Sequence, residues 1–138
     1  MMRRNRFQPT PLVLGLLLTA HVGAALAQDD FRPLFDGRTL KGWHTTPGGK
    51  WEVKDGMIVG TSQKSETKHG LLVSDKQYDD FTVRFKFRVV TGNSGFYFRS
   101  DPVKGSVGVH GFQAEVDNSQ AVSGLYETGG RAWVKQPD

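Results

Sequence analysis

Regular alternation of apolar and polar residues is the clearest pattern in this chain. Between Asp80 and Val90 the apolar residues occupy every second position, at Phe81, Val83, Phe85, Phe87 and Val89. A period of two is that of a β-strand with one buried face, and no helical template fits these positions. We therefore predict a strand over residues 80–90, with Phe85 at the centre of its buried face.

A hairpin is predicted over residues 51–61. Asp55-Gly56 is a favoured two-residue turn, because a type I′ turn needs positive φ at both central positions. This turn sets the register of the two strands, so Val53 should lie opposite Ile58 and Trp51 opposite Gly60. The Trp51 indole would then cover the bare glycine backbone.

Shorter alternating runs continue toward the C-terminus. We predict strands over 95–100, after a turn at 91–94, and over 111–117, with shorter strands at 71–73 and 124–126 and a polar loop at 62–70. Glycine is frequent, at 17 of 138 residues, and no amphipathic helix is present. Short strands separated by Gly- and Asp-rich turns indicate an all-β sandwich or barrel.

The first 27 residues have the pattern of a secretory signal. Residues 1–7 are basic, residues 11–20 are apolar, and Ala25 and Ala27 supply the small residues that a signal peptidase reads. The alternative is a membrane anchor, but Thr19, His21 and Gly23 interrupt the apolar stretch, which is then marginal for spanning a bilayer. We predict cleavage before Gln28, a single domain over 28–138, and a secreted or periplasmic protein without a stable membrane span.

Charge and composition exclude several classes of function. The chain has 18 basic and 14 acidic residues, but three of the basic residues lie in the signal, so residues 28–138 carry a net charge of only +1. A near-neutral domain gives no indication of a nucleic-acid partner. There are no cysteines, and His44, His69 and His110 lack metal-ligand spacing. We predict neither a metal site nor a cofactor.

Residues 111–117 contain the strongest candidate for chemistry. On a strand, Phe112, Ala114 and Val116 share one face, whereas Gln113, Glu115 and Asp117 share the other, with neighbours about 6.5–7 Å apart. One interpretation is a solvated outer face. The other is a ligand face on which one carboxylate raises the pKa of its neighbour, so that it can act as an acid or base.

Residues 95–100 supply a possible counterpart. If Phe96 and Phe98 face the core, Tyr97 and Arg99 face the other side, and a neighbouring strand would bring Arg99 against Glu115 or Asp117. The alternative for Arg99 is a structural ion pair. Tyrosine, arginine, amide and carboxylate groups on one face suit sugar binding. The further candidates for sugar contacts are Tyr126, Arg131 and Trp133.

Several stretches together resemble the 3-keto-disaccharide hydrolase family, in a branch of secreted bacterial members. They are residues 31–43, 51–60, 78–99, 111–117 (GFQAEVD) and 123–137 (SGLYETGGRAWVKQP), in this order. The resemblance implies a concanavalin-like, two-sheet antiparallel jelly roll and a carbohydrate substrate already oxidised at C3. The family domain continues for several further strands, so we expect residues 28–138 to be the N-terminal part of a longer domain.

The implied substrate defines the chemistry that the site needs. A ketone at C3 acidifies the proton at C2, so a carboxylate can remove this proton, and the enolate then expels the C1 substituent before water adds. This sequence needs a base, an oxyanion stabiliser and a proton donor. The candidates are Glu115 or Asp117 as base, Arg99 as stabiliser, and Tyr126 or the second carboxylate as donor.

Two other functions fit parts of the pattern. In laminarinase-like endo-glucanases, a second glutamate follows a motif that begins like Glu115-Val116-Asp117, but here Ser119 and Gln120 occupy its place. A retaining glycosidase needs two carboxyl groups about 5–5.5 Å apart, so one of them is missing. A non-catalytic carbohydrate-binding module has the same fold. Glu115 and Asp117 favour an enzyme, since binding a neutral sugar has less need of paired charges.

Overall fold

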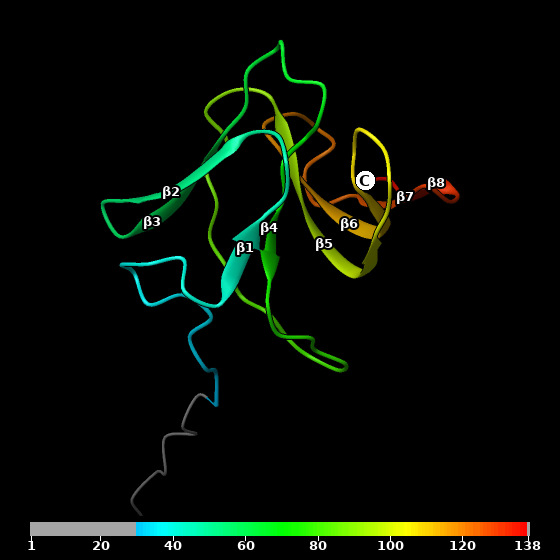
Figure 1. Ribbon diagram of the computed structural model, residues 1–138. Helices are drawn as coiled ribbons and strands as arrows, with labels where there is room; N and C mark the ends of the chain where they lie inside the picture. Colours follow the sequence, from blue (N-terminus) through cyan, green and yellow to red (C-terminus); the bar gives the residue numbers. More distant parts are fainter. Residues whose placement is uncertain (1–29, 138) are drawn as a thin grey trace, which may run out of the picture. The chain divides into compact units, whose positions relative to one another are not determined.

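The computed structural model describes residues 30–137, which form eight β-strands and no helix (Figure 1). The strands are β1 (Trp43–Thr45), β2 (Lys50–Lys54), β3 (Met57–Thr61), β4 (Leu72–Ser74), β5 (Asn93–Pro102), β6 (Val109–Asp117), β7 (Leu125–Thr128) and β8 (Ala132–Lys135). All of them lie within the compact unit Pro33–Asp138. The predicted signal, residues 1–27, lies outside the described residues. Within residues 30–137, no helix has the length and apolar character needed to cross a membrane.

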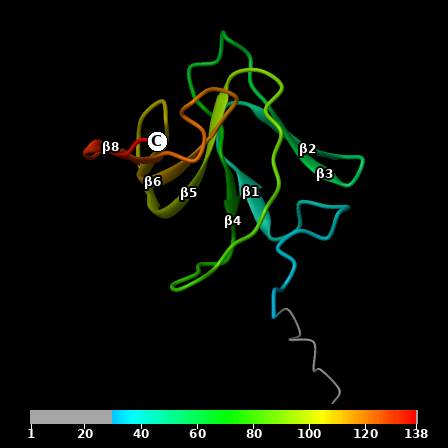
Figure 2. The ribbon, with the colours of Figure 1, turned by 180° about the vertical axis from the view of Figure 1, so that it is seen from behind.

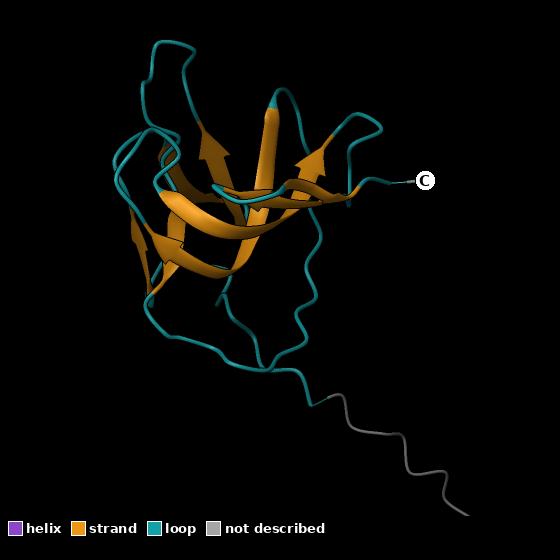
Figure 3. Cartoon of the chain, turned by 90° about the vertical axis from the view of Figure 1, so that its right-hand side faces the viewer, coloured by secondary structure: helices purple, strands orange, loops and turns teal. Residues whose placement is uncertain are grey.

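The strands form three antiparallel sheets, which confirms the all-β prediction. β1 pairs with β4, β2 pairs with β3, and β5 to β8 form a four-stranded sheet in sequence order. Figure 3 shows the strands in orange, joined only by loops. The predicted strands near 71–73, 95–100, 111–117 and 124–126 correspond to β4, β5, β6 and β7, whereas β1 and β8 were not predicted.

The β2–β3 hairpin has the predicted turn and register. Asp55 and Gly56 adopt φ values of 51° and 74°, as a type I′ turn requires. Val53 lies opposite Ile58, and Trp51 lies opposite Gly60. A Cβ atom at Gly60 would come within 2.7 Å of the Trp51 ring, so the indole does cover this glycine. The indole Nε1 also donates a hydrogen bond to the Gly70 carbonyl at 3.2 Å.

The prediction of a strand over residues 80–90 is wrong. Residues 81–89 run as a coil between β4 and β5 (Figure 2), and Phe85 is 48% exposed. Alternation selects an apolar face, but a strand also needs a hydrogen-bonded partner, and within residues 30–137 this segment pairs with none. Its apolar side chains pack locally instead, with the Phe85 ring centroid 5.0 Å from that of Phe96 on β5.

On β6 two polar side chains are more deeply buried than most of the apolar ones. Among the described residues, Val109 is the only apolar side chain that is almost fully buried, at 6% exposure. Gln113 and Glu115 are nearly as buried, at 7% and 8%, whereas Phe112, Ala114 and Val116 are only half-buried. The most enclosed face of the four-stranded sheet is therefore its polar face, and burial there requires hydrogen-bond partners.

Candidate active site

A row of four side chains crosses the four-stranded sheet. Tyr97 on β5 lies opposite Gln113 on β6, Gln113 lies opposite Tyr126 on β7, and Tyr126 lies opposite Trp133 on β8. Directly paired residues of antiparallel strands project from the same face. The Tyr126 and Trp133 rings meet edge to face, with centroids 5.3 Å apart. The structure thus brings together four of the predicted sugar-contacting residues.

The two predicted catalytic carboxylates lie next to this row. Glu115 and Asp117 follow Gln113 on the same face of β6, opposite Gly95 and Asn93 of β5. The Asn93 amide Nδ2 donates to Glu115 Oε2 at 2.9 Å and to Asp117 Oδ2 at 3.0 Å. One neutral amide group therefore holds both carboxylates, which reduces the repulsion that two such charges on one face would cause.

Gln113 holds the other oxygen of Glu115. Its Nε2 donates to Glu115 Oε1 at 3.0 Å and to the Ser94 carbonyl at 3.4 Å. The Gln113 side chain occupies the space above Gly95, where a Cβ atom would lie 2.3–2.5 Å from its Nε2, Cγ and Cδ atoms. Glycine at position 95 is what allows the amide to reach Glu115. We use the name polar face for Asn93, Tyr97, Gln113, Glu115, Asp117, Tyr126, Thr128 and Trp133.

Thr128 connects the row to the end of the sheet. Its Oγ1 lies 3.3 Å from the Tyr97 hydroxyl and 3.4 Å from Gln113 Oε1, so it can donate to either. Burial raises the pKa of the Tyr97 phenol above its usual value, and the nearby Glu115 and Tyr126 add to the rise. Tyr97 therefore keeps its proton at neutral pH and can donate a hydrogen bond.

The raised pKa that one interpretation gave to one carboxylate of this face does not belong to Asp117. Hydrogen bonds from the Asn93 side chain, and then from the Ser119 backbone N–H at 2.9 Å, stabilise the charged form and lower the pKa of this carboxyl. Asp117 is therefore ionised at neutral pH but is weakened as a base.

Arg99 is not where the sequence placed it. The β5–β6 register shifts between Phe98 and Asp101, and Arg99 has a φ of 46° in this irregular stretch. Gly95 and Asn93, rather than Arg99, stand opposite the carboxylates, and the Arg99 guanidinium lies 3.3 Å from Asp80 Oδ1. The expected pairing with Glu115 or Asp117 is wrong, and the ion pair that Arg99 makes with Asp80 is an exposed one.

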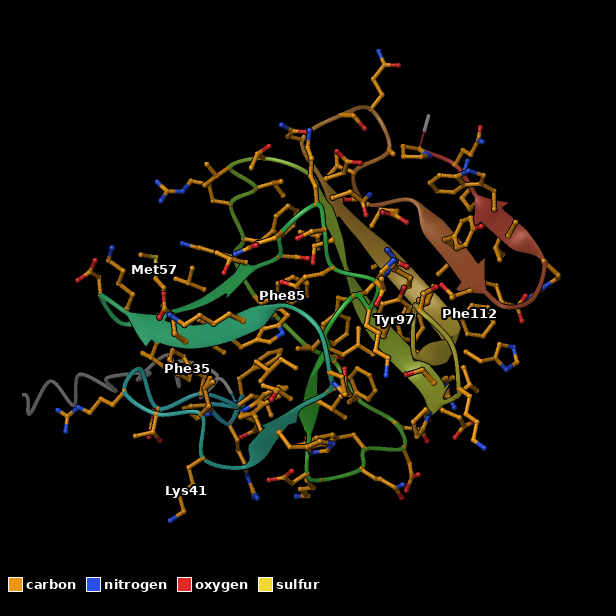
Figure 4. The ribbon with its side chains drawn as sticks, turned by 45° about the horizontal axis from the view of Figure 1, so that its top comes forward. Phe35, Lys41, Met57, Phe85, Tyr97 and Phe112 are labelled. Carbon is orange, nitrogen blue, oxygen red and sulfur yellow. The ribbon has the colours of Figure 1, made fainter. Side chains whose placement is uncertain are left out.

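Arg131 also lies away from the polar face. Its Nε pairs with Glu127, and its guanidinium carbon lies 5.8 Å from the centroid of the Phe112 ring. Glu127 and Phe112 face each other across β6 and β7, one position out of step with Gln113 and Tyr126. Alternation puts them on the opposite face of the sheet. Figure 4 labels Phe112 together with Tyr97 of the neighbouring strand.

Sequence reasoning missed two residues that organise the site. Asn93 was assigned to a turn, but β5 begins there, and Thr128 lies two residues beyond the predicted end of its strand. Extending the period-two pattern of Gly95–Tyr97 back to Asn93, and that of Tyr126 forward to Thr128, would have put both on the correct face.

The described residues offer no grouped metal ligands. Within residues 30–137, no three histidine or carboxylate side chains come together in a way that would hold a metal ion. The place of the second glutamate of a laminarinase-like site is a turn, in which Ser119 donates its backbone N–H to Asp117 and its Oγ accepts a hydrogen bond from the Ala121 N–H.

Comparison with known protein families matches residues 30–137 to the 3-keto-alpha-glucoside-1,2-lyase-like domain. The match covers most of the chain, so the protein belongs to this family, as its resemblance to 3-keto-disaccharide hydrolases implied. The family domain is a jelly roll, in agreement with the antiparallel all-β architecture. A comparison with curated proteins found no match.

Proposed function

We propose that this protein cleaves 3-keto-glycosides, including 3-keto-disaccharides, by removing the C2 proton, eliminating the C1 substituent and adding water. The observation that carries the proposal is the pair of carboxylates held by Asn93 beside a row of tyrosine, glutamine and tryptophan side chains. The family match supports a 3-keto-glucoside as the substrate.

The sugar ring binds over the row. Trp133 is 39% exposed and packs edge to face with Tyr126, so its indole has an aromatic surface free to contact the C–H groups of a pyranose. The amide of Gln113 and the hydroxyls of Tyr97 and Thr128 supply the donors and acceptors that sugar hydroxyls need. The reacting carbons then lie between Tyr97 and Glu115.

Glu115 is the base that removes the C2 proton. Its two oxygens accept hydrogen bonds from Asn93 and Gln113, which uses two of about four lone-pair positions on an ionised carboxylate. Asp117 is less suited to this role, because the hydrogen bonds that lower its pKa also lower its basicity. Asp117 serves instead to hold Asn93.

Tyr97, rather than Arg99, stabilises the oxygen at C3. When the C2 proton leaves, its electron pair forms an enolate and negative charge develops on the former ketone oxygen. The Tyr97 phenol keeps its proton at neutral pH and accepts a hydrogen bond from Thr128, so its own O–H is free to point at that oxygen. Arg99 pairs with Asp80 instead.

The enolate then re-forms the ketone and breaks the bond from C1 to its substituent. Tyr126 gives a proton to the departing oxygen, and an unsaturated 3-keto-sugar remains. Water then adds to C1: its oxygen bonds to C1, one of its protons returns to Tyr126, and C2 takes a proton from Glu115 after that proton has exchanged with solvent. Both residues are thereby restored, and the net reaction is hydrolysis. Each step needs only acid–base groups and the carbonyl already present in the substrate.

Isosteric variants test these roles with a 3-keto-disaccharide as substrate. Glu115→Gln keeps the shape but removes the basic charge, so kcat should fall by about 10²–10⁴-fold. Asp117→Asn at the neighbouring position should have a much smaller effect on kcat. A larger loss of kcat in Asp117→Asn than in Glu115→Gln would make Asp117 the base. Full activity in both variants would show that the base does not lie on this strand.

The alternative function is a non-catalytic carbohydrate-binding domain. It is favoured by the low exposure of Glu115, at 8%, and by the hydrogen bonds that both its oxygens already accept. A binding domain would bind the 3-keto-sugar and its unoxidised parent with similar affinity and release no product from either. Product release from the oxidised sugar alone supports the enzyme.

The site of action that we propose is outside the cytoplasm. The support is the order of a basic segment, an apolar segment and Ala25-Leu26-Ala27 in the first 27 residues. Mass spectrometry of the protein recovered from the periplasm or medium should give Gln28 as the first residue. Retention of residues 1–27 would indicate an anchored protein instead.

A further inference from the structure

The loop between β5 and β6 borders an open hollow at one end of the polar face. The hollow has a volume of about 430 Å³, which falls within the usual range of about 300–1,000 Å³ for small-molecule sites. Its walls come from residues 103–110 and from Thr128 and Gly129 at the end of β7. None of these residues has a role in the chemistry proposed above except Thr128, which positions Tyr97.

Thr128 makes this hollow continuous with the candidate active site. Thr128 borders the hollow, and its side-chain Oγ1 lies within hydrogen-bond distance of Tyr97 and Gln113. On this face of β6, Gln113 follows Glu115 and lies opposite Tyr126. Gly111 comes next and lies opposite Thr128, and Val109 follows at the hollow. Gln113 and Gly111 are about 7 Å apart at the usual strand rise. A substrate whose reacting ring lies at Glu115 therefore extends past Tyr126 toward the hollow.

The lining suits a polyhydroxylated ring. Lys104 and Ser106 bring an ammonium and a hydroxyl, whereas Val103, Val107 and Val109 bring apolar surface for C–H groups. No carboxylate lines the hollow, so a neutral sugar meets no fixed negative charge. Small-molecule sites of this kind combine mainly apolar walls with a few polar groups that fix orientation.

The loop is fixed by the rest of the fold. Its two ends are joined by a hydrogen bond from the Val103 N–H to the Gly108 carbonyl at 3.1 Å. Its tip is tied to the loop before β4, where the His69 N–H donates to the Ser106 carbonyl at 3.0 Å. Both contacts use backbone atoms, so side chains of the loop can be changed without removing them.

We propose that this hollow binds the C1 substituent of the substrate, and in particular the second hexose ring of a 3-keto-disaccharide. The inference rests on the proposed function and adds the site that recognises the leaving group. A second hollow is lined by Phe85, Phe96, Phe98 and neighbouring residues. Phe96 and Phe98 alternate with Tyr97 along β5, so this hollow lies on the face of the sheet opposite Glu115 and Asp117. It is therefore not in line with C1.

The test compares two substrates that share the 3-keto-glucosyl ring. One carries a methyl group at C1, and the other carries a second hexose. Ser106→Phe, which fills the hollow, should raise KM for the disaccharide about tenfold and leave kcat/KM for the methyl glycoside within about twofold, as expected when uniform binding is lost at one end. Lys104→Ala is a milder variant that should raise KM for the disaccharide alone. Ser62→Phe puts the same ring at an exposed position outside the hollow and should change neither substrate.

A binding measurement separates failure of this inference from failure of the proposed function. The unoxidised disaccharide should shift the backbone amide NMR signals of Ser106 and Gly108, whereas methyl glucoside should not, because only the disaccharide reaches the hollow. Equal effects of Ser106→Phe on both substrates, or no shift of the Ser106 and Gly108 amide signals with the disaccharide, would overturn the hollow as the leaving-group site. Wild-type protein that cleaves neither 3-keto-substrate would overturn the proposed function instead.

Discussion

Gly95 provides the sharpest test of the geometry around Glu115. An alanine methyl group at this position would lie 2.3–2.5 Å from three atoms of the Gln113 side chain, so Gln113 must move. Gln113 is only 7% exposed and donates to Glu115 at 3.0 Å, so movement leaves a buried carboxylate with one donor fewer. Overpacking costs about 1–3 kcal/mol and a hydrogen bond to a charged group about 1.5–3 kcal/mol. We expect Gly95→Ala to lower the free energy of unfolding by roughly 3–5 kcal/mol.

A double-mutant cycle isolates the steric cause. In a Gln113→Ala background the colliding side chain is absent, so Gly95→Ala should cost less than about 1 kcal/mol there. Urea unfolding of the wild type, the two single variants and the double variant gives the coupling energy directly. If Gly95→Ala costs the same in both backgrounds, Gln113 does not occupy the space above Gly95, and the hydrogen-bond network built on it is wrong.

Two further predictions concern Asn93 and Phe85. Asn93→Ala removes the largest cause of the low Asp117 pKa, so an NMR titration should show this pKa returning toward its ordinary value of 3.8. A carboxyl whose pKa is lower in the folded than in the unfolded protein stabilises the fold at pH values above the unfolded-state pKa, and this stabilisation is lost as the pH falls through the folded-state pKa. The difference in the free energy of unfolding between wild type and variant should therefore be widest at neutral pH and should narrow below about pH 4. A difference that is constant with pH would refute this. Phe85→Asp should cost only about 1–2 kcal/mol, since the ring is half-exposed and loses mainly its contact with Phe96. Val90→Asp, at a position 79% exposed, should cost about 0.5 kcal/mol or less, and a loss above about 4 kcal/mol for Phe85→Asp would restore the buried strand that the alternation predicted.

Local patterns predicted local structure well in this chain. The Asp55-Gly56 turn determines its own register, because only two residues must adopt positive φ for Val53 and Ile58 to meet. Alternation along residues 111–117 also put Gln113, Glu115 and Asp117 on one face, and the register with β5 and β7 then added Tyr97 and Tyr126.

The errors arise where a non-local contact or a backbone irregularity decides the outcome. Residues 80–90 have the pattern of a strand, but the sequence of one segment does not specify whether a partner pairs with it. We predicted that Arg99 lies on the same face as Tyr97 because the two residues are two positions apart, but the register shift after Phe98 breaks this alternation. Arg131 precedes Ala132, whose φ of 64° breaks the extended backbone in the same way.

The central claim is that cleavage begins at C2, and the most direct measurement is the isotope content of the product formed in D₂O. Elimination followed by hydration gives C2 a proton from solvent, so the 3-keto-glucose released from a 3-keto-disaccharide should carry one deuterium at C2, beyond the exchange measured without protein. This holds whichever step limits the rate. The unoxidised disaccharide should give no product, because its C2 proton is not acidic. Product that keeps its original C2 hydrogen, or equal cleavage of the unoxidised sugar, would contradict the account.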